Sequence, residues 1–122
     1  MKKVILLVED DEDNITITSK RLRRKEFDVL EARDGQQGVD MAMENKPDLI
    51  LMDIRLPVLN GVDAIRAIKA NDATKAIPII ALTGEAMEHQ RQEILDAGSD
   101  DFHAKPLTFN RLLVQINDLL DK

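Results

Sequence analysis

The sequence predicts an α/β domain in which five parallel strands form a doubly wound sheet covered by five helices. Apolar runs begin near residues 4, 28, 49, 77 and 101, and each interval leaves room for one helix. Strands that alternate with helices in this way form parallel sheets. Three runs are nearly continuous, as in strands buried on both faces: Val4–Val8, Leu49–Met52 and Ile77–Leu82.

The other two strands are less regular in composition. Phe27–Ala32 mixes polar and apolar residues, so we expect it at an edge of the sheet. The last run, Phe102–Ala104, is short and leads directly into Lys105. Pro47 and Pro78 stand before or at the start of strands, where a missing N–H donor is tolerated.

Helical spacing and a capping sequence predict the first two helices. Ile15, Ser19 and Leu22 share one face of a helix expected over about residues 14–25. Asp34 is suited to N-cap the second helix. Gln37 stands at the capping-box position of that helix. The buried face of the second helix is predicted to consist of three apolar residues: Val39, Ala42 and Met43.

The last three helices differ in the strength of their apolar patterns. The third is marked by a single apolar stripe: Val62, Ile65 and Ile68. The fourth, near residues 87–97, is weakly amphipathic, with Ile94 and Leu95 as anchors, and is expected to end at Gly98. The fifth has the clearest helical spacing: Leu112, Leu113, Ile116, Leu119 and Leu120.

Composition limits the class of protein. The chain has 122 residues, which fits one domain over residues 1–122. It contains no cysteine, so disulfides, thiolate zinc sites and cysteine nucleophiles are excluded. A net charge of −6 argues against a nucleic-acid-binding protein. No apolar run approaches the roughly 18 residues of a membrane span. We therefore expect a cytoplasmic protein that binds neither nucleic acid nor membranes.

Polar residues of different kinds follow the apolar runs. Asp53 closes the third run, and Glu9 and Asp10 follow the first. Thr83 and Lys105 follow the fourth and fifth runs. The carboxyl ends of parallel strands meet at one edge of a sheet, so these side chains are expected to share one site.

Three carboxylates gathered in one place repel one another. Two like charges about 4 Å apart cost about 4 kcal/mol at an effective dielectric of about 20, so the cluster needs a cation. Mg²⁺ suits it, because this hard ion binds carboxylates, phosphate oxygens and water. Asp53 could then attack a phosphoryl group. Lys105 and Thr83 could meet the phosphoryl oxygens.

Five motifs in a fixed order carry a family resemblance. They are Val-Glu-Asp-Asp at 8–11, Leu-Met-Asp-Ile-Arg-Leu-Pro at 51–57 followed by Gly61, Ala-Leu-Thr-Gly at 81–84, Gly-Ser-Asp-Asp-Phe at 98–102 and Lys-Pro at 105–106. From end to end the chain resembles a receiver domain of the two-component response regulator family, the CheY-like superfamily, of the single-domain type. The resemblance implies a flavodoxin-like sheet with strand order 2-1-3-4-5, as in CheY.

The resemblance also implies a function in two-component signal transduction and phosphorelay. Asp53 would accept a phosphoryl group from a phosphohistidine of a histidine kinase or histidine phosphotransfer protein, with Mg²⁺ as cofactor. The phosphorylated protein would then contact an unknown downstream protein target. It would catalyse its own phosphorylation and dephosphorylation, so we do not expect an enzyme that acts on a separate substrate.

By the same resemblance, Glu9 and Asp10 correspond to the acidic pair of the family, with Asp10 as the direct metal ligand. The backbone carbonyl of Arg55 would bind the metal together with Asp53. The choice of this pair rests on register, because Glu9 directly follows the apolar run. The pair at 10–11 is the alternative.

Two further residues resemble the conformational switch of the family. Thr83 would turn toward the phosphoryl group, and Phe102 would swing into the space that it leaves. An unchanged Phe102 rotamer with and without a phosphoryl mimic would contradict this hypothesis. A cis peptide bond between Lys105 and Pro106 is also implied, and it would help to aim the lysine.

Several surface residues have more than one interpretation. Arg55 and Glu85 match positions that tune phosphoryl lifetime, and they either pair across the entrance or remain separate solvated charges. Ile17 lies off the inward helix face, where it is either an ordinary exposed residue or a docking point for the phosphodonor. The basic segment Lys20–Lys25 either complements a helix dipole or docks an acidic partner.

Other functions and contexts fit the sequence less well. The same fold could be a receiver excised from a hybrid histidine kinase or a multidomain response regulator. An aspartate-nucleophile phosphatase would need an acid where Arg55 stands. A flavin-binding module would need a loop that attracts phosphate, whereas Glu9–Asp13 would repel it. His89 is expected on a solvated helix surface and His103 in the sheet or on the surface, so the donor histidine would belong to another protein.

Overall fold

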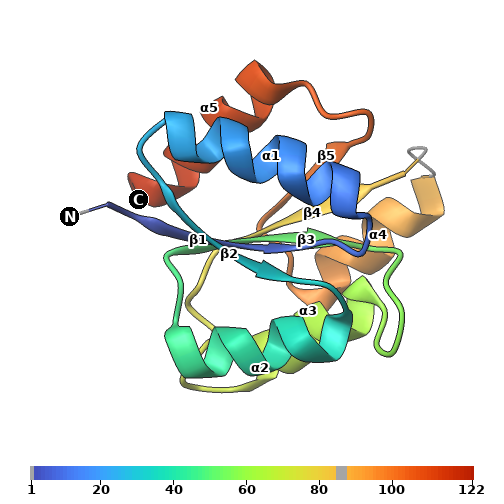
Figure 1. The fold of residues 1–122 in the computed structure, drawn as a ribbon. Helices are drawn as coiled ribbons and strands as arrows, with labels where there is room; N and C mark the ends of the chain where they lie inside the picture. Colours follow the sequence, from blue (N-terminus) through green and yellow to red (C-terminus); the bar gives the residue numbers. More distant parts are fainter. Residues whose placement is uncertain (1, 85–87) are drawn as a thin grey trace.

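The computed structural model describes residues 2–84 and 88–122, with side chains for all of these except 88 and 89. Strands and helices alternate along the chain (Figure 1). The strands are β1 (Val4–Val8), β2 (Asp28–Ala32), β3 (Leu49–Asp53), β4 (Ile79–Thr83) and β5 (Asp101–Ala104). The helices are α1 (Glu12–Arg24), α2 (Gly35–Asn45), α3 (Gly61–Ala70), α4 (Glu88–Ala97) and α5 (Phe109–Leu120).

The strands form one parallel sheet in the order β2-β1-β3-β4-β5. Helices α1 and α5 cover one face, and α2, α3 and α4 cover the other (Figure 1). The predicted fold class and strand order are therefore confirmed. The strand expected at an edge is β2, which borders only β1.

Successive residues of a central strand pack into opposite cores. In β1, Ile5 and Leu7 join the core beneath α1 and α5, whereas Leu6 and Val8 join the core beneath the other three helices. This two-sided burial explains why the run is apolar throughout. Val8 lies opposite both Ala32 and Met52. The neighbouring strands thus end at nearly the same level, which brings the residues after them to one edge.

Two element boundaries differ from the predicted ones. Helix α1 begins at Glu12, two residues early, because the side chain of Asp11 accepts a hydrogen bond from the N–H of Asp13 and caps it. Strand β4 begins at Ile79 instead of Ile77. The N–H of Ile77 donates to the Thr74 carbonyl in the preceding turn and is not available to the sheet.

Two residues predicted to be buried are exposed, and those predictions are wrong. Met43 is 37% exposed, because the inward face of α2 is centred on its glycines; a Cβ at Gly38 would lie 2.9 Å from Val8 Cγ2. Leu95 is 40% exposed. Among the described side chains of helix α4, only Ile94 and Ala97 are buried.

The remaining helix predictions agree with the structure. Asp34 caps α2 through the N–H of Gln37, although the Gln37 side chain closes the capping box on Arg33 and not on Asp34. Helix α4 ends at Gly98, whose φ is +110°. The predicted apolar stripes of α3 and α5 face the two cores. No helix within the described ranges is long and apolar enough to cross a membrane.

Gly61 lets the chain turn tightly against the end of β3. Its N–H donates to the Ile54 carbonyl over 2.9 Å. A Cβ at this position would lie 2.1 Å from the carbonyl oxygen of Asp53. A side chain at position 61 would therefore displace the backbone that carries Asp53.

Gly61→Ala should lower the free energy of unfolding by about 1–3 kcal/mol, because the new methyl group overlaps the backbone. Gly84→Ala is the matched control, since a Cβ there would meet nothing within 4 Å among the described residues. Its effect should stay within about 1 kcal/mol in either direction. Urea unfolding followed by circular dichroism measures both, and equal stability of the two variants would contradict the prediction.

Candidate functional site

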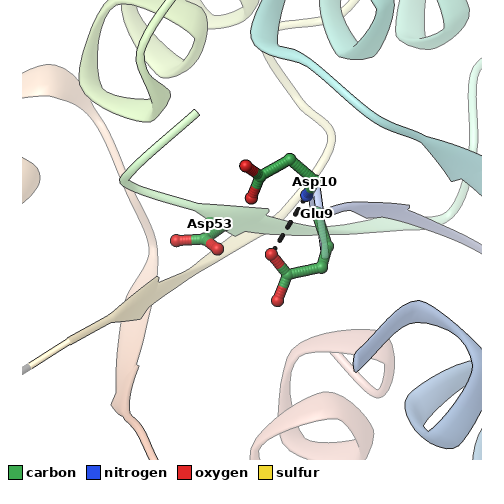
Figure 2. A group of neighbouring side chains, drawn as sticks. All are labelled: Glu9, Asp10 and Asp53. Atoms are coloured by element: carbon green, nitrogen blue, oxygen red, sulfur yellow. Dashed lines mark hydrogen bonds between the residues drawn. The ribbon is translucent and has the colours of Figure 1, made fainter. Parts of the chain in front are cut away.

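The residues at the ends of four strands meet at the carboxyl edge of the sheet. Figure 2 shows Glu9 and Asp10, which follow β1, next to Asp53 at the end of β3. Thr83 ends β4, the neighbour of β3, and Lys105 follows β5. The topology thus brings all five residues expected in one site to one region.

The three carboxylates form a compact group. Glu9 and Asp53 are 3% and 5% exposed, whereas Asp10 is exposed. One oxygen from each lies within 4.8 Å of the others. Glu9 Oε2 accepts a hydrogen bond from the N–H of Asp10 over 3.0 Å. Asp11 instead caps α1, so the geometry groups residues 9 and 10 with Asp53 and gives Asp11 a structural role.

Lys105 supplies the positive charge of the site. Its Nζ lies 2.8 Å from Asp53 Oδ2 and 3.0 Å from Glu9 Oε1. Its backbone N–H donates to the Thr83 carbonyl over 2.7 Å. The peptide bond to Pro106 is cis, as the resemblance implies. Pairing with the end of β4 therefore holds Lys105 where its ammonium meets two buried carboxylates.

Thr83 has a buried hydroxyl for which the described residues provide no hydrogen-bond partner. The residue is 4% exposed, and its Oγ1 makes no hydrogen bond within the described part of the chain. Buried polar groups are nearly always hydrogen-bonded, so such an atom calls for an explanation. A hydroxyl at this edge is available to donate to an oxygen that enters the site.

Burial and charge change the pKa values of two groups. Burial raises the pKa of Glu9 above its ordinary value of 4.5, and Asp53 raises it further, while Lys105 opposes both. Burial alone would lower the pKa of Lys105. The carboxylates of Asp53 and Glu9 outweigh that effect and raise the pKa above 10.5. The lysine therefore remains charged at neutral pH.

The acidic group fits a hard divalent cation. Carboxylate oxygens are the ligands that Mg²⁺ prefers, and Glu9, Asp10 and Asp53 each turn one toward a common point. One ammonium cannot neutralise three carboxylates. Asp53 Oδ1 also accepts a hydrogen bond from the N–H of Arg55 over 3.1 Å, which orients the carboxylate. The backbone carbonyl of Arg55 as a further ligand stays a prediction.

Asn14 also belongs to the site, whereas the side chains of Glu85 and His89 lie outside the described part of the structure. Asn14 was not predicted, yet its Nδ2 donates to Glu9 Oε1 over 3.3 Å from the first turn of α1. Its place just after the acidic loop is the one sequence feature that points to it. Glu85 lies outside the described residues, so its pairing with Arg55 stays a prediction, and the side chain of His89 is likewise not described. His103 lies in the sheet, on β5.

Comparison with known protein families identifies the family of this chain. The sequence model named "Response regulator receiver domain" matches residues 5–117. The chain belongs to the response regulator receiver family. The matched region runs from β1 into α5 and includes every residue of the site described above.

Individual receivers align over almost the whole chain. The polar-differentiation response regulator DivK of Brucella anthropi is 32% identical over 120 residues, which is 98% of each chain. The receiver domain of the sensor histidine kinase PA1611 of Pseudomonas aeruginosa PAO1 is 38% identical with a TM-score of 0.93, and both chains are fully covered. That structure was solved with a magnesium ion coordinated in its active-site cleft.

A second kinase receiver is also similar. The signal receiver domain of a histidine kinase of Syntrophus aciditrophicus is 28% identical with a TM-score of 0.91, covering 98% of this chain and 90% of the other. The similarity therefore extends both to a response regulator and to receivers of histidine kinases. The chain is accordingly a phosphoryl-accepting receiver of two-component signalling.

Mg²⁺ binding should weaken as the pH falls, and the weakening should begin above pH 4.5, the ordinary pKa of a glutamate carboxyl. Because the pKa of Glu9 is raised, protons compete with the metal at a higher pH than they would for an exposed glutamate. The number of protons released on binding should therefore increase as the pH falls from neutral toward that raised pKa.

Isothermal titration calorimetry in buffers of different ionisation enthalpy measures both the affinity and the protons released. Glu9→Gln is the matched variant, since it keeps the shape of the side chain but does not titrate. It should bind Mg²⁺ more weakly and lose the added proton release. Equal proton release by the two proteins would show that Glu9 is not the competing group.

Proposed function

We propose that Asp53 is the phosphoacceptor of this receiver and that Glu9 and Asp10 hold Mg²⁺ beside it. The observation that carries the proposal is the Lys105 ammonium, 2.8 Å from Asp53 Oδ2, at the same edge as the Thr83 hydroxyl, which has no partner among the described residues. A buried carboxylate among these groups is placed for nucleophilic phosphoryl transfer. The magnesium ion in the PA1611 receiver supports the choice of metal.

In the proposed reaction, a carboxylate oxygen of Asp53 attacks the phosphorus of a phosphohistidine. The new P–O bond forms as the P–N bond breaks, and the donor imidazole leaves with the electron pair and takes up a proton. Lys105 contacts one phosphoryl oxygen, and the Thr83 hydroxyl donates to another. Bound Mg²⁺ supplies further positive charge to the phosphoryl oxygens.

The same groups would also promote dephosphorylation, in which water hydrolyses the aspartyl phosphate. The receiver would thus catalyse its own phosphorylation and dephosphorylation and act on no separate substrate. Arg55, and Glu85 if it lies nearby, would tune how readily water enters. The cytoplasmic location expected from the sequence stays a prediction.

Phe102 is placed to transmit phosphorylation to the protein surface. Its side chain is partly buried against the core beneath α3 and α4. The guanidinium of Arg91, on α4, lies 4.5 Å from the centre of the ring. If Thr83 turns toward the phosphoryl group, an inward movement of Phe102 would change this contact. The surface formed by α4, β5 and α5 would then contact the downstream protein.

The phosphodonor is proposed to dock beside α1. A pocket of about 540 Å³ has Glu9 and Lys105 among its lining residues, together with Ile17, which is 57% exposed, and Phe109. An apolar partner surface at Ile17 would therefore lie next to the phosphoacceptor. This geometry fits a helix of a histidine kinase or a histidine phosphotransfer protein.

A second pocket of about 380 Å³ extends the donor-facing surface toward the end of α1. Basic side chains line it: Arg21, Arg24 and Lys25. Arg21 and Phe109 line both pockets, so the two are adjacent. An acidic segment on the donor would complement this end, which favours the docking interpretation of the basic cluster.

The phosphoacceptor assignment predicts a mass gain of one phosphoryl group when the protein is incubated with Mg²⁺ and a small phosphodonor such as acetyl phosphate. Asp53→Asn should show none, because an amide is a poor nucleophile. Asp118→Asn, an exposed change on α5, is the control and should behave like the wild type. Intact-mass spectrometry measures the gain. An equal phosphoryl gain by all three proteins would contradict the proposal.

Ile17→Asp should slow phosphotransfer from a protein donor by about tenfold or more, because it places a charge in an apolar contact. Transfer from acetyl phosphate should be unchanged. Val114→Asp is the matched control, since Val114 is 59% exposed on α5, away from the pocket. Transfer from a panel of phosphorylated histidine kinases of the source organism measures the effect. Equal slowing by both variants would place the donor elsewhere.

A further inference from the structure

His103 is a buried imidazole whose two ring nitrogens both have hydrogen-bond partners. The proposed phosphoryl-transfer reaction does not use it. The residue lies on β5 and is 1% exposed. Its Nε2 accepts a hydrogen bond from the N–H of Thr108 over 3.1 Å. Its Nδ1 lies 2.6 Å from Gln115 Oε1, on α5. The ring therefore links the strand to the start and the middle of the following helix.

The partners determine the direction of every hydrogen bond in this chain of contacts. A backbone N–H can only donate, so Nε2 of His103 carries no proton. Gln115 Nε2 donates to the Phe102 carbonyl and to Asp101 Oδ2, each over 2.9 Å. Its Oε1 therefore faces the imidazole and accepts from it. The ring is the neutral tautomer with its proton on Nδ1.

The hydrogen bond of Thr108 fixes one end of residues 105–108, the segment that begins with the site lysine. At the start of this segment, the N–H of Lys105 donates to the Thr83 carbonyl over 2.7 Å. At its end, the N–H of Thr108 donates to His103. The Thr108 side chain makes no capping hydrogen bond at the start of α5. The His103 imidazole instead accepts a hydrogen bond from the backbone N–H of this N-cap residue. Lys105 thus projects from a segment held at both ends.

We propose that His103 is a positioning residue for phosphoryl transfer, acting through the backbone of residues 105–108 on the Lys105 ammonium. The proposal rests on the proposed function of Asp53. An apolar residue of similar volume would fill the space but leave the Thr108 N–H and Gln115 Oε1 without a partner. The segment would then be free to shift, and small displacements of a charged group slow a reaction strongly.

Two amide variants of His103 distinguish its hydrogen bond to Thr108 from its hydrogen bond to Gln115. His103→Gln places an acceptor near the position of Nε2 and can keep the bond to Thr108. His103→Asn places a donor near the position of Nδ1 and can keep only the bond to Gln115. With acetyl phosphate and Mg²⁺, His103→Asn should be phosphorylated about tenfold more slowly than the wild type, whereas His103→Gln should stay within about twofold. Equal rates for the wild type and both variants overturn the proposal.

A double-mutant cycle tests whether His103 acts through the lysine. In a Lys105→Met background, His103→Asn should cause no further slowing of the residual reaction, because the group that it positions is already absent. The same tenfold slowing in both backgrounds would mean a general structural effect and would overturn the proposal. Thermal unfolding followed by circular dichroism checks that each variant is folded under the assay conditions.

One measurement does not depend on any variant at position 103 being folded and active. Long-range ¹⁵N–¹H correlation spectra of the wild type at pH 7.5 report which ring nitrogen carries the proton. A spectrum of His89→Gln leaves His103 as the source of the remaining imidazole signals. The tautomer with the proton on Nδ1 supports the proposal, and the Nε2–H tautomer overturns it. A wild type that gains no phosphoryl group overturns the proposed function instead.

Discussion

The contact of one ammonium with two buried carboxylates is the interaction on which the rest of this site depends. Asp53 and Glu9 are nearly inaccessible to water, and burying two like charges together is unfavourable unless a cation is present. Lys105 lies within hydrogen-bonding distance of both. Its charge balances only part of the cluster, which includes the exposed carboxylate of Asp10. The remaining negative charge makes a divalent cation a natural component of the site.

This arrangement is a property of the sheet more than of any loop. Parallel pairing with nearly level strand ends brings residues 9, 53, 83 and 105 to one edge, although the first and the last are 96 positions apart. Gly61 then allows the chain to turn closely against the end of β3 without displacing Asp53. The apolar strands thus act as a rigid support, and the chemistry depends on the few polar residues at their ends.

Strand β5 and Lys105, which directly follows it, contact three different parts of the molecule. Phe102 packs into the core shared with α3 and α4, where Arg91 contacts its ring. The next residue, His103, faces α5 and bonds to Gln115 and Thr108. Lys105 then enters the site. Because successive residues of a strand point to opposite faces, this one short strand contacts both α4 and α5, and it would connect the proposed phosphoacceptor to both helices.

The sequence by itself determined the fold class, the order of the elements and the polar residues at the strand ends, because apolar runs and the residues that end them are local features. It also favoured Glu9 over Asp11 by register. Only the tertiary structure decided that Met43 and Leu95 are exposed, since that depends on how closely each helix approaches the sheet. The partners of His103 and Asn14 likewise became visible only in the fold, because hydrogen bonds between separate elements depend on distances that no local pattern records.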